Sequence, residues 1–245
     1  PVSRRMMGVR SDITPQIARI ATTRLAKAPR PLRLSYAGTV LQVQGTSLSP
    51  DREIVQAGVE LIGSAELTAD AEVILVAAEA LRSAGVGKPS FDLGAPALVP
   101  FVCAGLNMDE TLTAKARAAL DRKDMGGLME LADGQRTILR ALLDASGRAD
   151  TALAKLEALK LPEPAAELVA ALGEVIGHVR AADSKLMLTI DPVEFRGLGY
   201  QTGISFTIFA RGVRGELGRG GRYPLTTGET ATGATLFVAP LMRIA

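Results

Sequence analysis

Apolar and polar positions alternate most clearly over residues 52–63. Every second position there carries an apolar side chain, namely Val55, Ala57, Val59 and Leu61. Because successive side chains of a strand point to opposite faces, the segment is predicted to be a half-buried β-strand. Gln56 and Glu60 occupy the other face, and Gly58 between them leaves room above the sheet. One small ligand with a cation or hydrogen-bond donors could contact both side chains; the alternative is a polar face turned to water.

A second strand is predicted before this one, over residues 32–43. Its Gly38 marks a point of close approach or a β-bulge, because a glycine within a strand has no side chain to pack. Only a short loop separates the two predicted strands. Consecutive strands are usually neighbours in space, so residues 32–43 and 52–63 should form an antiparallel pair.

Helical periodicity is found on both sides of this pair. A helix is predicted from about residue 16 to 26, with Thr14 able to cap it and Pro15 suited to its first position. A longer amphipathic helix is predicted over residues 68–84, and a strand follows over residues 88–94.

Residues 96–182 differ in character, since they are rich in Ala, Leu and charged residues and have helical periodicity throughout. Six helices are predicted there, over residues 97–106, 110–122, 126–132, 135–145, 149–159 and 163–182. We interpret this region as a helical subdomain inserted between two parts of a core, residues 1–95 and 183–245.

Strand character returns near the C-terminus, with strands predicted over residues 185–191 and 203–210. Glycines then crowd a predicted turn. Within it, the segment Gly218–Arg222 could cradle a phosphate with backbone N–H groups and two guanidiniums, and a glycine-rich hairpin is an equal alternative. The terminal segment, residues 230–244, is predicted to be a helix.

Composition narrows the class of protein. Of 245 residues, 47% are hydrophobic and 22% are charged, which is ordinary for a soluble globular protein. The formal net charge of +2, without a long basic run, argues against nucleic-acid binding. The chain has no secretory signal and no apolar run long enough to cross a bilayer, so no membrane association is expected. It starts at Pro1 without a methionine, which leaves open whether a segment precedes it.

Cys103 and His178 are the only residues of their types. A single cysteine excludes an intrachain disulfide and makes a reducing cytoplasm the default location. Cys103 lies in an apolar run, which predicts a buried, inert thiol. Without a second His or Cys nearby, His178 is predicted to be a surface or capping residue. Neither a metal nor another cofactor is expected, and no Ser/His/Asp or Cys/His catalytic set can be assembled.

Five short motifs come in one order along the chain: Arg10-x-Asp12-x-Thr14, Arg33–Gly38, Gln56-x-Gly58-x-Glu60-x-x-Gly63, Arg196–Tyr200 and Gly220–Tyr223. This ordered set resembles the catalytic core of histidyl-tRNA synthetase, and the resemblance covers nearly the whole chain except the helical insertion. It implies an α+β fold of the class II aminoacyl-tRNA synthetase type, with an antiparallel sheet, flanking helices and a helical insertion.

The resemblance also implies a set of histidine-binding positions. In the synthetase family, a carboxylate of the first motif and the glutamine and glutamate of the strand hold the substrate histidine. The matching positions here are Asp12, Gln56 and Glu60. Arg196 and Tyr200 match a family motif that lies over the amino acid.

Two signatures depart from the synthetase pattern. Gln42 stands where an arginine grips the ATP α-phosphate, and Phe237–Pro240 replaces the Gly-Leu-Glu-Arg signature with its ATP-binding arginine. An amide cannot supply the positive charge that stabilises developing phosphate charge. The histidine-binding residues are retained while the ATP-binding arginines are lost. This combination resembles the regulatory subunit family of ATP phosphoribosyltransferase, and the segments 14–19 and 211–223 also resemble that family.

This second resemblance implies a catalytically silent protein. Such a subunit binds the short-form catalytic subunit of ATP phosphoribosyltransferase, is needed for its activity in the first step of histidine biosynthesis, and mediates feedback inhibition by L-histidine. It self-associates as a dimer within a cytoplasmic hetero-octamer. One alternative is a divergent or truncated histidyl-tRNA synthetase, which would activate histidine with ATP. Another is a free-standing amino-acid-binding module.

Overall fold

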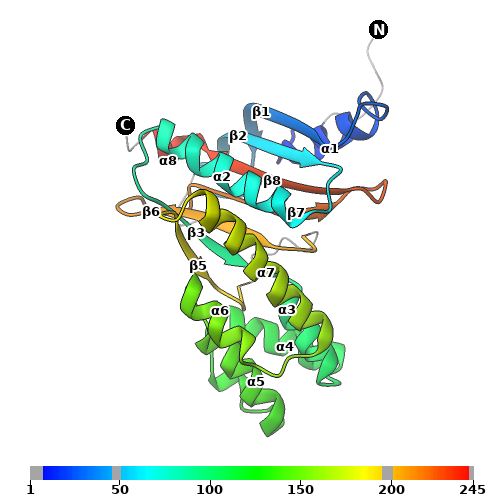
Figure 1. The fold of residues 1–245 in the computed structure, drawn as a ribbon, viewed down its shortest axis with the longest axis vertical. Helices are drawn as coiled ribbons and strands as arrows, with labels where there is room; N and C mark the ends of the chain where they lie inside the picture. Colours follow the sequence, from blue (N-terminus) through cyan, green and yellow to red (C-terminus); the bar gives the residue numbers. More distant parts are fainter. Residues whose placement is uncertain (1–7, 46–50, 195–200, 243–245) are drawn as a thin grey trace.

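The computed structural model describes residues 8–45, 51–194 and 201–242. Its described strands form one eight-stranded sheet in the order β1-β2-β8-β7-β6-β3-β5-β4 (Figure 1). The strands are β1 (Leu32–Leu41), β2 (Glu53–Ile62), β3 (Pro89–Gly94), β4 (Gly147–Arg148), β5 (Met187–Ile190), β6 (Ser205–Ala210), β7 (Gly218–Pro224) and β8 (Thr230–Phe237). All neighbours in this sheet are antiparallel except β3 and β5. The predicted antiparallel sheet is therefore found, with one parallel pair added.

The first two strands pair as predicted. β1 and β2 are antiparallel neighbours, with Gly38 opposite Gln56. β1 ends at Leu41, two residues before the predicted end. Gly38 is a point of close approach, because a Cβ added there would lie 2.5 Å from Nη2 of Arg10. The glycine therefore lets the segment that precedes α1 lie against the sheet.

Helices α1 (Thr14–Thr22) and α2 (Leu67–Ser83) cover opposite faces of β2. α1 packs in a small cluster with Ile62, whereas α2 shares the main core with the neighbouring Leu61, whose side chain points the other way. α1 begins and ends earlier than the predicted helix over residues 16–26. Pro15 lies in its first turn as predicted. Thr14 does not cap the helix, because Thr14 is already the first helical residue and the N-cap position is occupied by Ile13, whose apolar side chain accepts no hydrogen bond.

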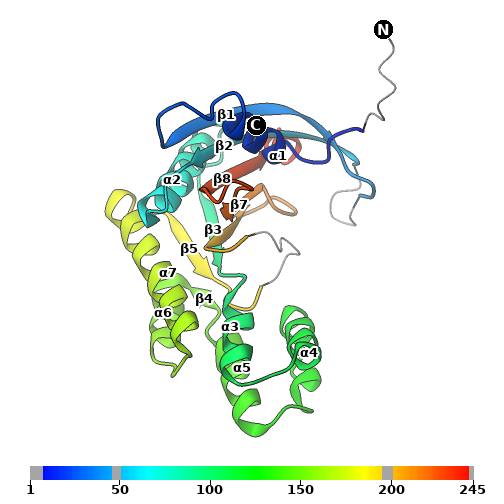
Figure 2. The ribbon, with the colours of Figure 1, turned by 90° about the vertical axis from the view of Figure 1, so that its right-hand side faces the viewer.

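The region between β3 and β5 is helical, as predicted. It holds α3 (Leu98–Gly105), α4 (Glu110–Asp121), α5 (Asp133–Asp144), α6 (Ala149–Glu157) and α7 (Glu163–Ala182), with the short strand β4. The predicted helix over residues 126–132 is wrong, since only the single 3-10 turn η1 (Gly126–Leu128) forms there. Figure 2 shows α7 next to α2 along one side of the sheet, while α3 to α6 lie beyond its end. The division of the chain into a core and an inserted subdomain stays a prediction.

Strand pairing and hydrogen bonds hold this helical region to the sheet. β4 pairs with β5, and Asp191 after β5 accepts hydrogen bonds from Lys123 Nζ at 2.5 Å and from Ser146 Oγ at 3.3 Å. Cys103 in α3 is fully buried and burial raises the pKa of its thiol, as predicted for an inert cysteine. The His178 side chain on α7 is 40% exposed beside Glu174, which confirms a surface position. Within the described ranges, no helix is both long and apolar enough to span a bilayer.

The C-terminal predictions are wrong in two places. The predicted glycine-rich turn is found only over residues 211–217, which join β6 and β7 in an antiparallel hairpin, whereas Gly218–Arg222 belongs to β7 in the middle of the sheet. The predicted helix over residues 230–244 is instead β8, followed by the short helix α8 (Val238–Leu241). β8 is buried on both faces, so small Thr, Ala and Gly side chains replace the alternating pattern that identifies a half-buried strand.

Candidate functional site

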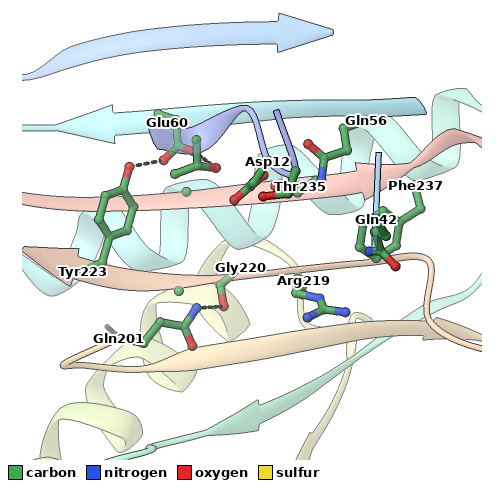
Figure 3. A pocket seen from close by; sticks show the side chains of 14 residues that line it. Asp12, Gln42, Gln56, Glu60, Gln201, Arg219, Gly220, Tyr223, Thr235 and Phe237 are labelled. Carbon is green, nitrogen blue, oxygen red and sulfur yellow. Dashed lines mark hydrogen bonds between the residues drawn. The ribbon is translucent and has the colours of Figure 1, made fainter. Parts of the chain in front are cut away.

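A polar cavity of about 170 Å³ opens on the face of the sheet that carries Gln56 and Glu60. Its walls come from β2, β7 and β8, from the end of β1, and from the segment before α1 (Figure 3). Segments from both ends of the chain therefore meet here. The cavity is smaller than the roughly 300–1,000 Å³ of sites for drug-sized ligands, which suits a small polar molecule.

Gln56 and Glu60 face this cavity together, as the alternation of β2 predicted. They are only 6% and 2% exposed, so the alternative of a polar face turned to water is wrong. Glu60 accepts hydrogen bonds from Thr14 Oγ1 at 2.9 Å and from the Tyr223 hydroxyl at 2.7 Å. Gln56 Oε1 accepts a bond from the backbone N–H of Ile13 at 3.3 Å. These bonds hold both side chains in place and join β2 to the start of α1.

The expected room above Gly58 is filled by an aromatic ring. A Cβ added at Gly58 would lie 2.3 Å from Cζ of Tyr36. The Tyr36 hydroxyl bonds to Thr235 Oγ1 at 2.6 Å and to Thr14 Oγ1 at 3.2 Å. Burial raises the pKa of Tyr36 to about 12, so it stays a neutral phenol. Gly58 therefore leaves room for the packed Tyr36 side chain of β1 and not for a ligand.

Burial also controls the charge of Glu60. It raises the pKa of this carboxyl to about 7, while the hydrogen bonds from Tyr223 and Thr14 oppose the rise and the nearby charge of Asp12 adds to it. A carboxyl with a pKa near neutrality gains much from a cationic or hydrogen-bond-donating partner, because such a partner favours the ionised form. Glu60 is thus suited to bind a protonated nitrogen.

The structure brings three of the five predicted site residues together. Asp12 lines the cavity with Gln56 and Glu60, and its Oδ1 accepts the backbone N–H of Ile13 at 2.8 Å. Arg196 and Tyr200 lie outside the described residues. Just after them, Gln201 lines the cavity and donates from Nε2 to the Gly220 carbonyl at 3.2 Å.

One face of β7 contributes three residues to the cavity that the sequence did not assign to the histidine-binding site. Arg219, Gly221 and Tyr223 alternate along the strand and so share one face. Period-two alternation was the available signal, but the glycines hid it. The phosphate-cradle hypothesis is wrong, because Arg222 points to the opposite face and is bound to Asp70, with Nη2 and Oδ2 2.6 Å apart.

β8 contributes Gly233, which has no side chain, and the aromatic ring of Phe237 to the cavity. Gly233 lies opposite Glu60, and a Cβ added there would be 1.9 Å from Oε2 of that carboxylate. Phe237 lies opposite Gln56 at the far end of the cavity, near Gln42 (Figure 3). In the described part of the chain, no cluster of three His, Cys, Asp or Glu side chains could hold a metal ion. The side chains that line the site offer carboxylates, amides, hydroxyls and the Arg219 guanidinium for binding.

Comparison with known proteins identifies the same family as the motifs. The family model of histidyl-tRNA synthetase matches residues 1–241. A protein of Rhodospirillum centenum named ATP phosphoribosyltransferase regulatory subunit is 52% identical over 244 residues, which are 99% of this chain and 63% of that protein. The protein of that name from Gluconobacter oxydans is 45% identical over 245 residues, 100% of this chain and 64% of its own length. The chain spans less than two thirds of these relatives.

Solved structures share the fold. A protein of Bacillus halodurans described as an ATP phosphoribosyltransferase regulatory subunit/histidyl-tRNA synthetase has a TM-score of 0.86 at 24% identity, covering 96% of this chain and 64% of that one. A histidine–tRNA ligase subunit of Alicyclobacillus acidocaldarius has a TM-score of 0.73 at 27% identity, covering 96% and 75%. A chain of the ATP phosphoribosyl transferase (HisG:HisZ) complex of Thermotoga maritima has a TM-score of 0.77 at 18% identity, covering 94% and 81%. The expected α+β, class II synthetase-like fold is confirmed.

Proposed function

This chain belongs to the histidyl-tRNA synthetase family, and we propose that within it the chain acts as a non-catalytic regulatory subunit of short-form ATP phosphoribosyltransferase. The observation that carries the proposal is the 52% identity over 99% of the chain to a relative of that name. In this role it binds the catalytic subunit in the cytoplasm, is needed for its activity in the first step of histidine biosynthesis, and carries feedback inhibition by L-histidine. A dimer of this chain within a hetero-octamer belongs to the same proposal.

The effector L-histidine binds in the cavity on β2. Asp12, Gln56 and Glu60 are the residues that hold it, with Arg196 and Tyr200 closing over the bound amino acid. Two carboxylates and an amide around a small buried space support this assignment, because they match the cationic amine and the two ring nitrogens of histidine. Inhibition then requires that histidine bind the inhibited state of the complex more tightly than the active one.

The absence of synthetase activity rests on two positions. Gln42, at the position of the synthetase arginine, lines the cavity with a neutral amide. α8 begins at Val238 and contains Pro240, in the segment where the synthetase signature carries its second arginine. Without these positive charges, a developing charge on the ATP α-phosphate has no strong stabilising partner.

The first experiment measures phosphoribosyl-ATP formation by the short catalytic subunit of the same source. Adding this chain should raise the rate, and L-histidine should reverse the rise.

Glu60→Ala should keep the activation but shift half-inhibition to at least ten-fold higher histidine, since a charge-assisted hydrogen bond contributes about 1.5–3 kcal/mol. Glu53→Ala, at an exposed position of the same strand, is the matched control and should leave inhibition unchanged. No activation by a folded sample would contradict the proposed function.

A histidyl-tRNA synthetase is the second candidate, because the 27% identical structure is named a histidine–tRNA ligase subunit. Histidine-dependent exchange of pyrophosphate into ATP separates the two functions. The regulatory subunit should show no exchange above background, and robust exchange would establish the synthetase instead.

A further inference from the structure

Arg219 is a cavity residue with an unsatisfied hydrogen-bond donor. Among the described residues that line the cavity, it carries the one cationic side chain. One Nη donates to Glu216, and the guanidinium lies 5.5 Å from the ring centre of Phe237. Its Nε, however, is buried and has no hydrogen-bond partner among the described residues. Buried N–H groups are nearly always paired, so this one indicates an acceptor that the described residues do not supply.

The charges of the cavity are separated into two ends. Figure 3 shows Glu60 and Tyr223 at one end and Arg219 with Gln42 and Phe237 at the other, while Asp12 lies between. Carboxylates therefore occupy the end and middle of the cavity, and the guanidinium occupies the opposite end. A ligand that matches both parts carries a cation or N–H donors at one end and an anion at the other.

Glycines form the sheet surface between these ends, and their lack of a Cβ lets the Glu60 carboxylate and the Gln201 amide lie close against the strands. Gly221 lies between Arg219 and Tyr223 on the same face of β7, and it pairs with Gly233 of β8. Arg219 and Tyr223 are four residues apart, so their backbones are about 13 Å apart along the strand. Together with the cavity volume of about 170 Å³, this spacing suits a ligand of amino-acid size.

We propose that Arg219 binds the free carboxylate of the amino acid in this cavity and so restricts the site to zwitterionic ligands. A guanidinium and a carboxylate form two parallel charge-assisted hydrogen bonds, and Nε–H is one of the donors that such a pair uses. A rotation of the side chain turns this N–H to the ligand, while Glu216 keeps the guanidinium at the cavity end. The inference rests on the proposed histidine site and names the group of the ligand that a further residue selects.

Titration calorimetry with two ligands tests the assignment. L-Histidine has the carboxylate, whereas L-histidinol has the same amine and imidazole with an alcohol in its place. Wild-type chain should bind histidine 10- to 100-fold more tightly than histidinol, as expected for one charge-assisted pair. Arg219→Gln should remove this difference by weakening histidine alone. Arg211→Gln, an exposed arginine in the segment before β7, is the matched control and should keep it.

Each outcome separates the two proposals. If wild-type chain binds no histidine, the proposed site fails and Arg219 loses its role with it. If wild-type chain binds histidine but Arg219→Gln weakens histidine and histidinol by the same factor, Arg219 has only a structural role and the inference is wrong. Unchanged binding of both ligands by Arg219→Gln would also overturn it. Circular dichroism melting of both variants establishes that each is folded before titration.

Discussion

Glu60 makes the stability of the free chain depend on pH. Its pKa is about 7 in the folded chain and 4.5 for an ordinary glutamate, so between these values the folded state binds a proton that the unfolded state does not. The contribution of Glu60 to the free energy of unfolding is therefore complete below pH 4.5 and is lost as the pH rises through 7. The buried carboxylate costs stability only when it is ionised without a ligand.

Glu60→Gln should expose this dependence, because its amide resembles the protonated carboxyl and does not titrate. Relative to wild-type chain, the variant should gain about 2 kcal/mol more at pH 8 than at pH 5.5, as follows from a pKa difference of about 2.5 units. Urea unfolding at both pH values measures the gain. The control Glu53→Gln, on the exposed part of β2, should change the free energy of unfolding by the same amount at pH 5.5 and at pH 8. If Glu60→Gln also gives the same change at both pH values, the assigned pKa is wrong.

The sequence predicted site residues correctly where the alternation of apolar and polar positions within one strand was enough to place them. Gln56 and Glu60 lie two positions either side of Gly58, so alternation alone placed them on one face, where they line one cavity. Arg219 and Tyr223 could not be found this way. Their place in the same cavity as Glu60 depends on the register of β7 with β8 and of β8 with β2, which no local pattern contains.

At the scale of elements, glycine was the main source of error. The glycines of β7 suggested a turn, yet a Cβ at Gly220 would lie 2.3 Å from both the Gly233 carbonyl and the ring of Phe206. Glycine is present there because neighbouring strands and rings approach closely, not because the chain turns. Helices with regular periodicity, such as α7, were predicted to the residue, since one amphipathic face is a local property.

Two glycine substitutions should therefore change the free energy of unfolding in opposite directions. Gly177 lies within α7 with no atom within 4 Å of an added Cβ, so Gly177→Ala should raise the free energy of unfolding by about 0.5–1 kcal/mol. Gly233→Ala on β8 places a methyl against Glu60 and should lower it by about 1–3 kcal/mol, with loss of histidine binding. Chemical unfolding of both variants gives the two signs, and a neutral Gly233→Ala would show that the cavity floor has room.

At the scale of the molecule, a buried ion pair between Asp70 and Arg222 ties α2 to the sheet. Asp70 of α2 and Arg222 of β7 are 2% and 8% exposed, and Arg222 also donates to the carbonyls of Ser64 and Glu66. Burial raises the pKa of Asp70, and the bond from Arg222 opposes this. Because Arg222 directly precedes Tyr223, the pair also fixes the cavity wall that holds Glu60.

Asp70→Asn should cost about 3–5 kcal/mol of unfolding free energy, since it leaves a buried guanidinium without its counter-charge. The same helix provides the control. Glu72 pairs with Arg33 at 2.5 Å, but this pair is exposed, so Glu72→Gln should cost less than about 1 kcal/mol. Similar losses for the two variants, measured by urea unfolding, would mean that the buried pair does not contribute through its charge.

The position of β8 has a consequence for synthesis on the ribosome. β8 comes last in sequence among the described strands, yet it lies in the sheet beside β2, which ends at Ile62. At roughly 5–20 residues per second, translation from Ile62 to Phe237 takes roughly ten to thirty-five seconds. During this interval the nascent β1–β2 hairpin has an open edge that can pair with other chains, so it should be a target for ribosome-associated chaperones until β8 emerges and closes it.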